Sequence, residues 1–285
     1  TDLSVDLDQL EEVFKKDSPA AFILVSVLGL VPEMEKIIDL CNKYDVILIE
    51  DVCESLGSKY KGRMLGSFGE LSFFSFYYGH HISTIEGGMV CTNNTELNDI
   101  LLSIRSHGWD RDLDKESQAK WREVWGIDDF RAQYTFYYPG MNLRSTDLQA
   151  FIGLNQLKKV EEFGNRRNKN FFEYINCLNS ADEQNNILKL EQRDGDFISN
   201  FCFPVINHNK EHIVHELIQN NIETRPLIAG SIGKNPFWEM FAKKGTLLPT
   251  PNCDLIDKYG FYVPNHQDLS IQDIQRVVNI ICSDK

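Results

Sequence analysis

The sequence predicts an α/β protein with a mixed, mostly parallel sheet in its first half and a smaller α+β domain in its second. Two apolar runs, residues 21–28 and 46–49, flank a helical pattern, as in a β-α-β unit with parallel strands. A helix start follows at Thr146, and the rhythm of short strands and helices changes after that helix. We therefore expect two domains, residues 1–160 and residues 161–285.

The first third of the chain alternates helices with strands. Residues 5–16 form an amphipathic pattern, and a second helix is expected after Pro32, because proline is favoured in the first turn and apolar residues follow at helical spacing. The two apolar runs around this helix are uninterrupted, which is typical of parallel strands buried on both faces. Two shorter runs, residues 71–76 and 89–92, are expected to extend the sheet.

The remaining chain contains an excursion, a long helix and the smaller domain. Residues 112–133 are polar with two tryptophans, and we expect them to form a loop or excursion. Thr146 and Gln149 form a capping box, and the helix that they open is long enough to link two domains. The smaller domain should contain strands at residues 200–206 and 223–228 and helices at residues 212–220 and 271–282.

The composition excludes several functional classes. The 285 residues are 42% hydrophobic and 25% charged, an ordinary balance for a globular protein. The formal net charge of −13 argues against nucleic acid or an anionic membrane as a partner, since both bind basic surfaces. No apolar run could span a bilayer, and no secretory signal is visible. The seven scattered cysteines include no CxxC pair, which favours reduced thiols in a cytoplasm over disulfides or a metal site.

An acidic cluster follows the second buried strand. Asp51 and Glu54 stand at or just beyond its carboxyl end, where α/β sheets bind their ligands. A carboxylate at this position would suit a cationic heteroaromatic nitrogen, because a buried carboxylate needs a partner. The alternative is that Asp51 caps a helix after the strand, which is the commonest role of aspartate at such a turn.

A second candidate segment, residues 75–88, reads S-F-Y-Y-G-H-H-I-S-T-I-E-G-G and begins with Ser75. Adjacent His80 and His81, among small and hydroxyl residues, could supply a general base near neutral pH. Two loop histidines with satisfied hydrogen bonds are the alternative. A metal pair is disfavoured, because adjacent side chains on an extended chain diverge and no further ligands complete a site.

Two more segments contain residues that could bind anions. Asn142 and Arg144 lie in a turn before the long helix and could meet a phosphate there, or they could be turn and cap residues only. Arg225 precedes a proline and could bind a carboxylate or a diphosphate through two hydrogen bonds. Taken alone, Arg225 is better explained by a surface ion pair.

Together and in this order, these segments resemble the DegT/DnrJ/EryC1/StrS sugar aminotransferase family of fold-type I pyridoxal-phosphate enzymes. The resemblance runs from Asp6 to about Val277. It implies the aspartate-aminotransferase fold, with a large cofactor-binding domain and a small C-terminal domain. In the family, the segment matching residues 75–88 reads approximately S-F-x-x-x-K-x-x-T-x-x-E-G-G, and its lysine binds the cofactor covalently. Here His80 stands at that position.

Within the family, the chain is most similar to the sugar 3-dehydratases that carry histidine at this position. The segments that carry this similarity are His80-His81, His107-Gly108-Trp109, Pro139-Gly140-x-Asn142 and Gln156-Leu157-Lys158-Lys159. A histidine cannot hold the cofactor covalently as lysine does, but it can move protons. The resemblance therefore implies 3-dehydration of a nucleotide-linked 4-keto-6-deoxy sugar, in deoxysugar biosynthesis such as that of lipopolysaccharide O-antigen.

The same resemblance implies the cofactors. Glutamate would convert pyridoxal 5′-phosphate to pyridoxamine 5′-phosphate, which then reacts with the sugar. A related CDP-sugar 3-dehydratase carries a cysteine-rich iron–sulfur insert, whereas residues 92–176 of this chain contain no cysteine. We therefore expect no iron–sulfur cluster and no metal.

The resemblance also implies roles for individual residues. His80 would be the catalytic residue, moving a proton at the C4′ carbon of the cofactor. Asp51 would keep the pyridine nitrogen protonated, Ser75 would donate to the cofactor phosphate, and Glu54 would support the cofactor. Asn142 would reach a phosphate across a dimer interface, which implies a homodimer with shared active sites.

Three residues are expected to contact the nucleotide sugar or glutamate, namely His81, Arg144 and Arg225. The nucleotide, GDP or CDP, stays open. Two alternatives to a dehydratase remain. One is a sugar aminotransferase that uses another lysine, with Lys59 and Lys61 the nearest before the motif. The other is a truncated, non-catalytic member of the family.

One departure from the family concerns the start of the chain. Family members begin with about a hundred more residues, which hold a Gly/Ser turn for the cofactor phosphate and an aromatic residue that stacks on the cofactor ring. We therefore expect the N-terminal part of the large domain to be missing from this sequence. We also expect this chain alone to bind the cofactor poorly.

Overall fold

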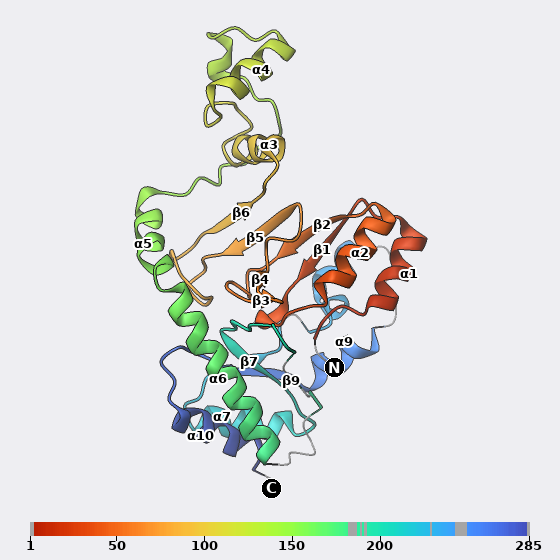
Figure 1. The fold of residues 1–285 in the computed structure, drawn as a ribbon, viewed down its shortest axis with the longest axis vertical. Helices are drawn as coiled ribbons and strands as arrows, with labels where there is room; N and C mark the ends of the chain where they lie inside the picture. The colour runs from red at the N-terminus through yellow and green to blue at the C-terminus, as the bar shows by residue number, and fades with distance from the viewer. Residues whose placement is uncertain are drawn as a thin grey trace.

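The computed structural model describes residues 3–181, 187–188, 190, 193–228, 230–242 and 250–283. Figure 1 shows two sheets, one in each half of the chain, joined by the bent helix formed by α5 (Asp147–Leu157) and α6 (Val160–Ser180). This arrangement confirms the predicted α/β architecture with a smaller second domain.

The first sheet is mixed and mostly parallel, as predicted. Its strand order is β1-β2-β5-β6. The first three strands run parallel and the last is antiparallel. The strands are β1 (Ala21–Val25), β2 (Ile47–Asp51), β5 (Leu71–Ser75) and β6 (Gly88–Cys91). Between β1 and β2 the chain passes through α2 (Met34–Tyr44), which is the β-α-β unit that the sequence predicted.

One face of this sheet is covered and the other is open. Leu24 and Leu48 are buried on the face that packs against α1 (Leu7–Asp17) and α2. On the opposite face Ile23 is 55% exposed and Ile47 is 51% exposed. The prediction of strands buried on both faces is therefore wrong for the described residues, because the two helices beside these strands lie on the same side of the sheet.

The second sheet is small and antiparallel. It has the order β7-β9-β8 and consists of β7 (Cys202–Ile206), β9 (Gly260–Pro264) and β8 (Arg225–Pro226). All five residues of β7 are buried, because α6, α7 (Lys210–Gln219) and α10 (Ile271–Ile281) pack around it. The remaining elements of this half are η3 (Ile232–Lys234), α8 (Pro236–Phe241) and α9 (Pro251–Tyr259).

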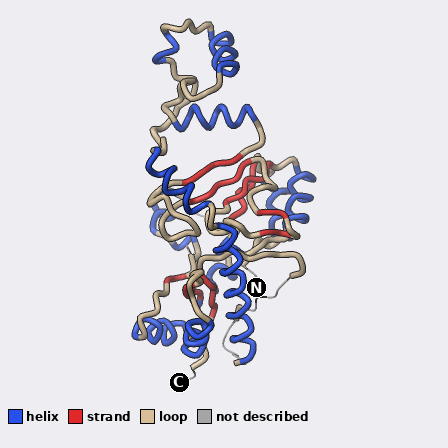
Figure 2. Tube along the Cα trace, turned by 60° about the vertical axis from the view of Figure 1, so that its left-hand side comes forward, coloured by secondary structure: helices blue, strands red, loops and turns tan. Residues whose placement is uncertain are grey.

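The excursion predicted at residues 112–133 projects from one end of the molecule in both Figure 1 and Figure 2. It follows α3 (Thr95–Arg105) and contains α4 (Lys115–Trp125) and η2 (Arg131–Tyr134), so it is only partly a loop. Asp114 caps the start of α4 by accepting the N–H of Ser117, and Gly126 ends it in a left-handed conformation. These two caps explain a helix that the hydrophobic pattern did not predict.

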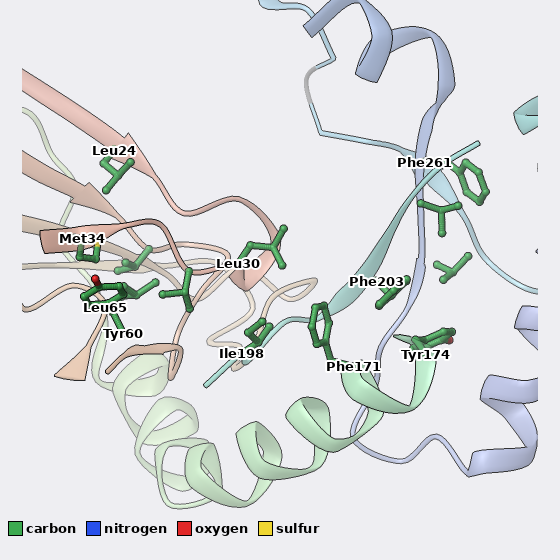
Figure 3. Close-up of a cluster of buried hydrophobic side chains, with 14 of the residues drawn as sticks. Leu24, Leu30, Met34, Tyr60, Leu65, Phe171, Tyr174, Ile198, Phe203 and Phe261 are labelled. Atoms are coloured by element: carbon green, nitrogen blue, oxygen red, sulfur yellow. The ribbon is translucent and has the colours of Figure 1, made fainter. Parts of the chain in front are cut away.

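The buried core is continuous between the two halves. Figure 3 shows Leu24 and Met34 beside the first sheet, Phe171 on α6, and Phe203 on β7 within one cluster. Shorter elements close this region, namely η1 (Val27–Gly29) and the hairpin of β3 (Lys59–Tyr60) and β4 (Arg63–Met64). Because the core crosses residue 160, the division into two domains at that position stays a prediction.

Candidate functional site

A cleft of about 640 Å³ lies between the loop that follows β5 and the second sheet. Residues 77–83 of that loop form one wall. The bent helix contributes Gln156 and Arg167, and the second half of the chain contributes Phe201 and Arg225. The cleft therefore joins segments from both halves, as ligand sites between domains do.

Asp51 and Ser75 do not line this cleft but lie at the ends of two neighbouring parallel strands, and the charge of Asp51 acts on His80 and Glu54 in the cleft. Asp51 is the last residue of β2 and pairs with Phe73 of β5, two residues before Ser75. Side chains two apart on a strand share a face, so Asp51 and Ser75 lie on the same face, which is the open one. Asp51 Oδ1 accepts the N–H of Cys53 at 3.1 Å, and Ser75 Oγ accepts the N–H of Tyr77 at 3.2 Å. Asp51 thus also has the turn-capping contact of the alternative interpretation.

His80 lies in the cleft with an unsatisfied ring nitrogen. Its Nδ1 is buried and has no hydrogen-bond partner within the described part of the chain. The ring packs against Phe201, with centroids 5.3 Å apart, and against the edge of Tyr77. Burial lowers the pKa of His80, and the negative charge of Asp51 opposes this effect. His80 is therefore a neutral base at pH 7, with one nitrogen available to a ligand.

His81 has the opposite environment. It is only 6% exposed, and its Nε2–H donates to the carbonyl oxygen of Ser199 at 2.7 Å. Burial lowers the pKa of His81 to about 3, and the positive charge of Arg167 lowers it further. These contacts favour a structural role, and substrate binding by His81 stays a prediction.

Glu54 lines the cleft and is poised to change its protonation state. Its Oε2 accepts the N–H of Leu28 at 2.8 Å. Burial raises the pKa of Glu54 to about 7, the hydrogen bond from Leu28 opposes this shift, and the charge of Asp51 adds to it. Such a carboxyl group can hold or release a proton near neutral pH.

Arg225 stands at the rim of the cleft, on β8. Its Nε and Nη2 both donate to Glu223 Oε1, at 3.1 and 2.7 Å, so it does form the surface ion pair of the simpler interpretation. This pairing with Glu223 raises the pKa of Arg225. Both side chains face the same cleft as His80, so the ion pair is also in place to meet a ligand.

Asn142 and Arg144 lie elsewhere. Both are exposed, and neither lines the cleft that contains His80. Asn142 pairs with Ser106 in an isolated bridge, and Arg144 Nε donates to Asn142 Oδ1 at 3.3 Å. Within one chain, the structure does not bring these two residues together with the other predicted site residues.

Sequence reasoning did not identify Phe201, Ser199 or the cleft role of Arg167. Arg167 is 4% exposed, and burial lowers its pKa to about 10. Ser199 lies 118 positions after His81 in the chain, and only folding brings the two together. A tandem Arg-Arg on a linking helix was visible in the sequence, but nothing in it indicated which arginine points into the protein.

Two lysines were weighed as alternatives to His80. Lys59 and Lys61 belong to the β3 hairpin and its turn, and Lys61 Nζ lies 2.6 Å from Glu35 in an exposed ion pair. Among the described residues, no lysine lines the cleft. The geometry therefore offers histidine rather than lysine chemistry at this site.

Comparison with known proteins matches this chain to one family. Residues 1–282 match the sequence model of the DegT/DnrJ/EryC1/StrS aminotransferase family. The GDP-4-keto-6-deoxy-D-mannose 3-dehydratase of Yersinia pseudotuberculosis is 33% identical over 285 residues, which cover 98% of this chain and 70% of that protein.

Solved structures agree with the sequence comparison. An Escherichia coli GDP-4-keto-6-deoxy-D-mannose 3-dehydratase with bound hydrated PLP superposes with a TM-score of 0.87 at 31% identity, covering 98% of this chain and 71% of that one. A mutant GDP-4-keto-6-deoxymannose 3-dehydratase with bound GDP-perosamine gives a TM-score of 0.86 at 30% identity, covering 99% of this chain and 72% of that one.

Proposed function

The chain belongs to the DegT/DnrJ/EryC1/StrS aminotransferase family, and on that premise we propose that it is a 3-dehydratase of a nucleotide-linked 4-keto-6-deoxy sugar. Its cofactor is pyridoxal 5′-phosphate, in its pyridoxamine form during dehydration, and L-glutamate is the amino donor. The observation that carries this proposal is His80, which stands where the family has lysine, lines the cleft and has a buried Nδ1 with no partner among the described residues.

The residues present fit this cofactor. Asp51 offers a carboxylate to a protonated ring nitrogen, and Ser75 offers a hydroxyl to a phosphate from the same face of the sheet. The orphaned Nδ1 of His80 lacks the partner that a buried polar atom needs, and a bound ligand would supply it. We assign Asp51, Glu54 and Ser75 to cofactor binding and His80 to catalysis.

The chemistry divides between cofactor and protein. When bound, the cofactor supplies an electron sink that allows the C3 hydroxyl of the sugar to depart. His80 is neutral at pH 7 because burial lowers its pKa, so it can accept the proton at C4′ of the cofactor. The same imidazolium, or a neighbouring group, can then protonate the departing oxygen. Hydrolysis releases ammonia and the 3-deoxy-4-keto sugar.

The substrate contacts are expected at the rim of the cleft. Arg225 and its partner Glu223 offer a donor and an acceptor to the nucleotide sugar or to glutamate. His81 is assigned to the inner wall, where it shapes the cleft next to His80. GDP as the nucleotide is supported by the GDP-perosamine bound to one similar enzyme.

A homodimer would complete the site. Asn142 and Arg144 are exposed on a turn whose apolar neighbours Met141 and Leu143 are 66% and 67% exposed. The apolar surface continues along α5, where four exposed side chains are Leu148, Phe151, Leu154 and Leu157. Exposed apolar surface of this kind marks an interface, so we assign it to a second copy of the chain, with Asn142 reaching the partner's cofactor phosphate.

We place the protein in the cytoplasm. No helix in the described ranges is long and apolar enough to cross a membrane. None of the seven cysteines forms a disulfide within the described part of the chain, which suits a reducing compartment.

Product mass tests the proposed function. The protein is incubated with pyridoxal 5′-phosphate, L-glutamate and GDP-4-keto-6-deoxymannose, and the molecular mass of the sugar product is measured. We expect a product that has lost the C3 oxygen and kept its ketone, with release of ammonia. A sugar with an amine at C4 would overturn the dehydratase assignment in favour of transamination.

A further inference from the structure

Helix α5 presents one face to the backbone of the loop that contains His80. Gln149, Gly153 and Gln156 are spaced by four and three residues, so they lie along the same side of the helix. All three meet the segment between residues 83 and 86.

Gln156 makes the closest connection. Its Oε1 accepts the N–H of Ser83 at 2.9 Å, and its Nε2 donates to the carbonyl oxygen of Ser83 at 2.6 Å. One amide side chain thus satisfies both backbone groups of one residue, as a neighbouring strand would. The two partners are 73 positions apart in the sequence and both line the cleft.

Two further contacts extend this connection. Gln149 Nε2 donates to the carbonyl oxygen of Glu86 at 2.8 Å. A Cβ on Gly153 would lie 3.0 Å from Cγ2 of Thr84, a residue that is only 5% exposed. The glycine therefore allows the helix to approach the loop closely enough for the glutamine contacts.

These contacts hold the backbone from three residues after His80. On this same side His81, the next residue, is tied to Ser199, and on the other side the N–H of His80 donates to the carbonyl oxygen of Tyr77 at 3.0 Å. His80 therefore lies between two anchored points of a short loop. If the Ser83 anchor were lost, this loop could move and take the imidazole with it.

We propose that Gln156 is a positioning residue, which holds the His80 imidazole in its catalytic place through Ser83. We call the pair of hydrogen bonds between Gln156 and Ser83 the clamp. The proposal rests on the proposed function, because the clamp affects the reaction through His80. Gln156 itself touches neither of the reacting groups assigned here. Since α5 continues into the linking helix α6, the clamp also ties the catalytic loop to the element that joins the two halves of the chain.

The test is the substitution Gln156→Met, which keeps a long unbranched side chain and removes both hydrogen bonds to Ser83. Three quantities are measured. They are kcat and KM for the nucleotide sugar, and the pKa of His80 from the NMR titration of its ring C–H signal, which is assigned by its loss in His80→Asn. We expect kcat to fall by about 10- to 100-fold with little change in KM, because a base displaced by about 1 Å loses that much.

The pKa measurement separates positioning from general stability. In the wild-type protein, burial lowers the pKa of His80. Release of the loop in Gln156→Met should therefore raise that pKa toward its ordinary value. Asp51 and His81 interact electrostatically with His80, and Gln156→Met alters neither. It also leaves unchanged the other titratable groups that line the cleft, namely Glu54, Tyr77, Tyr78, Arg167, Cys202, Glu223, Arg225, Tyr262 and His266. A purely structural role would lower the melting temperature and leave the pKa of His80 unchanged.

Asn155→Ala is the matched control. Asn155 is the neighbouring residue on α5, and among the described residues its amide donates to the carbonyl oxygen of Phe151 in the same helix. We expect it to leave both kcat and the pKa of His80 near their wild-type values. Hydrogen exchange of the Ser83 N–H in the wild-type protein gives an independent measurement if Gln156→Met does not fold. Strong protection supports the clamp, and exchange at the rate of a free loop amide overturns it.

The outcomes distinguish the two proposals. A raised His80 pKa with a lowered kcat supports both the clamp and the catalytic role of His80. A raised pKa with unchanged turnover keeps the contact between Gln156 and Ser83 but overturns the positioning role, while the chemistry of His80 is decided by the His80→Asn variant. An unchanged pKa in a folded Gln156→Met variant overturns the clamp, whatever the product analysis shows for the proposed function.

Discussion

The segment of residues 75–88, which contains the His80 loop, and the turn of residues 138–147 were both predicted to serve an active site, the turn through Asn142 across a dimer interface, and they lie in different environments. The loop is packed into the protein, with Ile82 4% exposed. The turn lies on the surface, where Leu143 is 67% exposed. The loop lines the cleft, and Asn142 in the turn does not.

This difference separates the part of the site that one chain completes from the part that needs a second copy of the chain. The loop finds its contacts inside the chain, at Ser199 and Gln156. The turn carries polar residues next to apolar side chains that the described residues leave uncovered. Exposed polar groups beside an apolar surface are typical of an interface. We infer that the loop supplies the catalytic base of one site and the turn supplies a phosphate contact of the partner's site.

The largest effect is expected from His80→Asn. Asparagine fills a similar space but cannot accept a proton near neutral pH, so turnover should fall by about 100- to 10,000-fold. Release of ammonia and of the deoxygenated sugar measures this loss. The melting temperature serves as the control and should change little, because Nδ1 of His80 has no partner to lose among the described residues. Turnover close to that of the wild type would remove His80 from the mechanism.

Subunit complementation tests the partner's share of the site. His80→Asn and Asn142→Ala are each expected to be nearly inactive, but a mixed dimer of the two contains one intact site. After denaturation and joint refolding in equal amounts, about a quarter of wild-type activity should return, since half of the dimers are mixed and half of their sites are intact. If the mixture is no more active than the separate variants, the turn does not act across an interface.

The burial of His81 should make the free energy of unfolding depend on pH. Its pKa is about 3 in the folded protein, against an ordinary value of 6.5 for histidine. Below pH 6.5 the unfolded chain binds a proton that the folded protein does not, so the free energy of unfolding falls by about 1.4 kcal/mol per pH unit. Urea unfolding at about pH 7 and about pH 5.5 measures this loss.

His81→Gln is the comparison variant for this measurement. Its amide can still donate to the Ser199 carbonyl oxygen, but it does not titrate. The wild type should lose more stability than His81→Gln between the two pH values, while other groups contribute equally to both proteins. Parallel curves for the two proteins would show that His81 is protonated in the folded state and is not buried as described.

The smallest effect is expected from Thr146→Ala, in the turn region. Thr146 and Gln149 form a capping box at the start of α5, and loss of such a cap costs about 1 kcal/mol. Urea unfolding should register this loss. Thr146→Ser, which keeps the hydroxyl, is the control and should stay near the wild type. Equal destabilisation by both substitutions would mean that the methyl group, not the cap, is important.

Local patterns predicted much of the fold. The β-α-β unit, the capping box at Thr146 and the smaller α+β domain follow from periodicity and turn chemistry, which depend on neighbouring residues. The antiparallel order of the small sheet was not predicted, because its central strand β9 was not recognised in the sequence. Helix α4 was missed because its polar composition hid it, although its caps at Asp114 and Gly126 were readable. The open face of the first sheet could not be predicted, because an apolar strand does not show which helices will cover it.

The sequence by itself determined the chemistry available to this protein, whereas the tertiary structure decided how each group is used. The order of Asp51, Ser75 and His80 and the replacement of the family lysine are present in the chain itself, and with the family they indicate a proton-transfer enzyme. The adjacent histidines differ only after folding, because Ser199 and Phe201, more than a hundred positions away, bury one ring against a carbonyl oxygen and leave the other facing the cleft. Burial and charge set a pKa, and both depend on neighbours in space rather than in sequence.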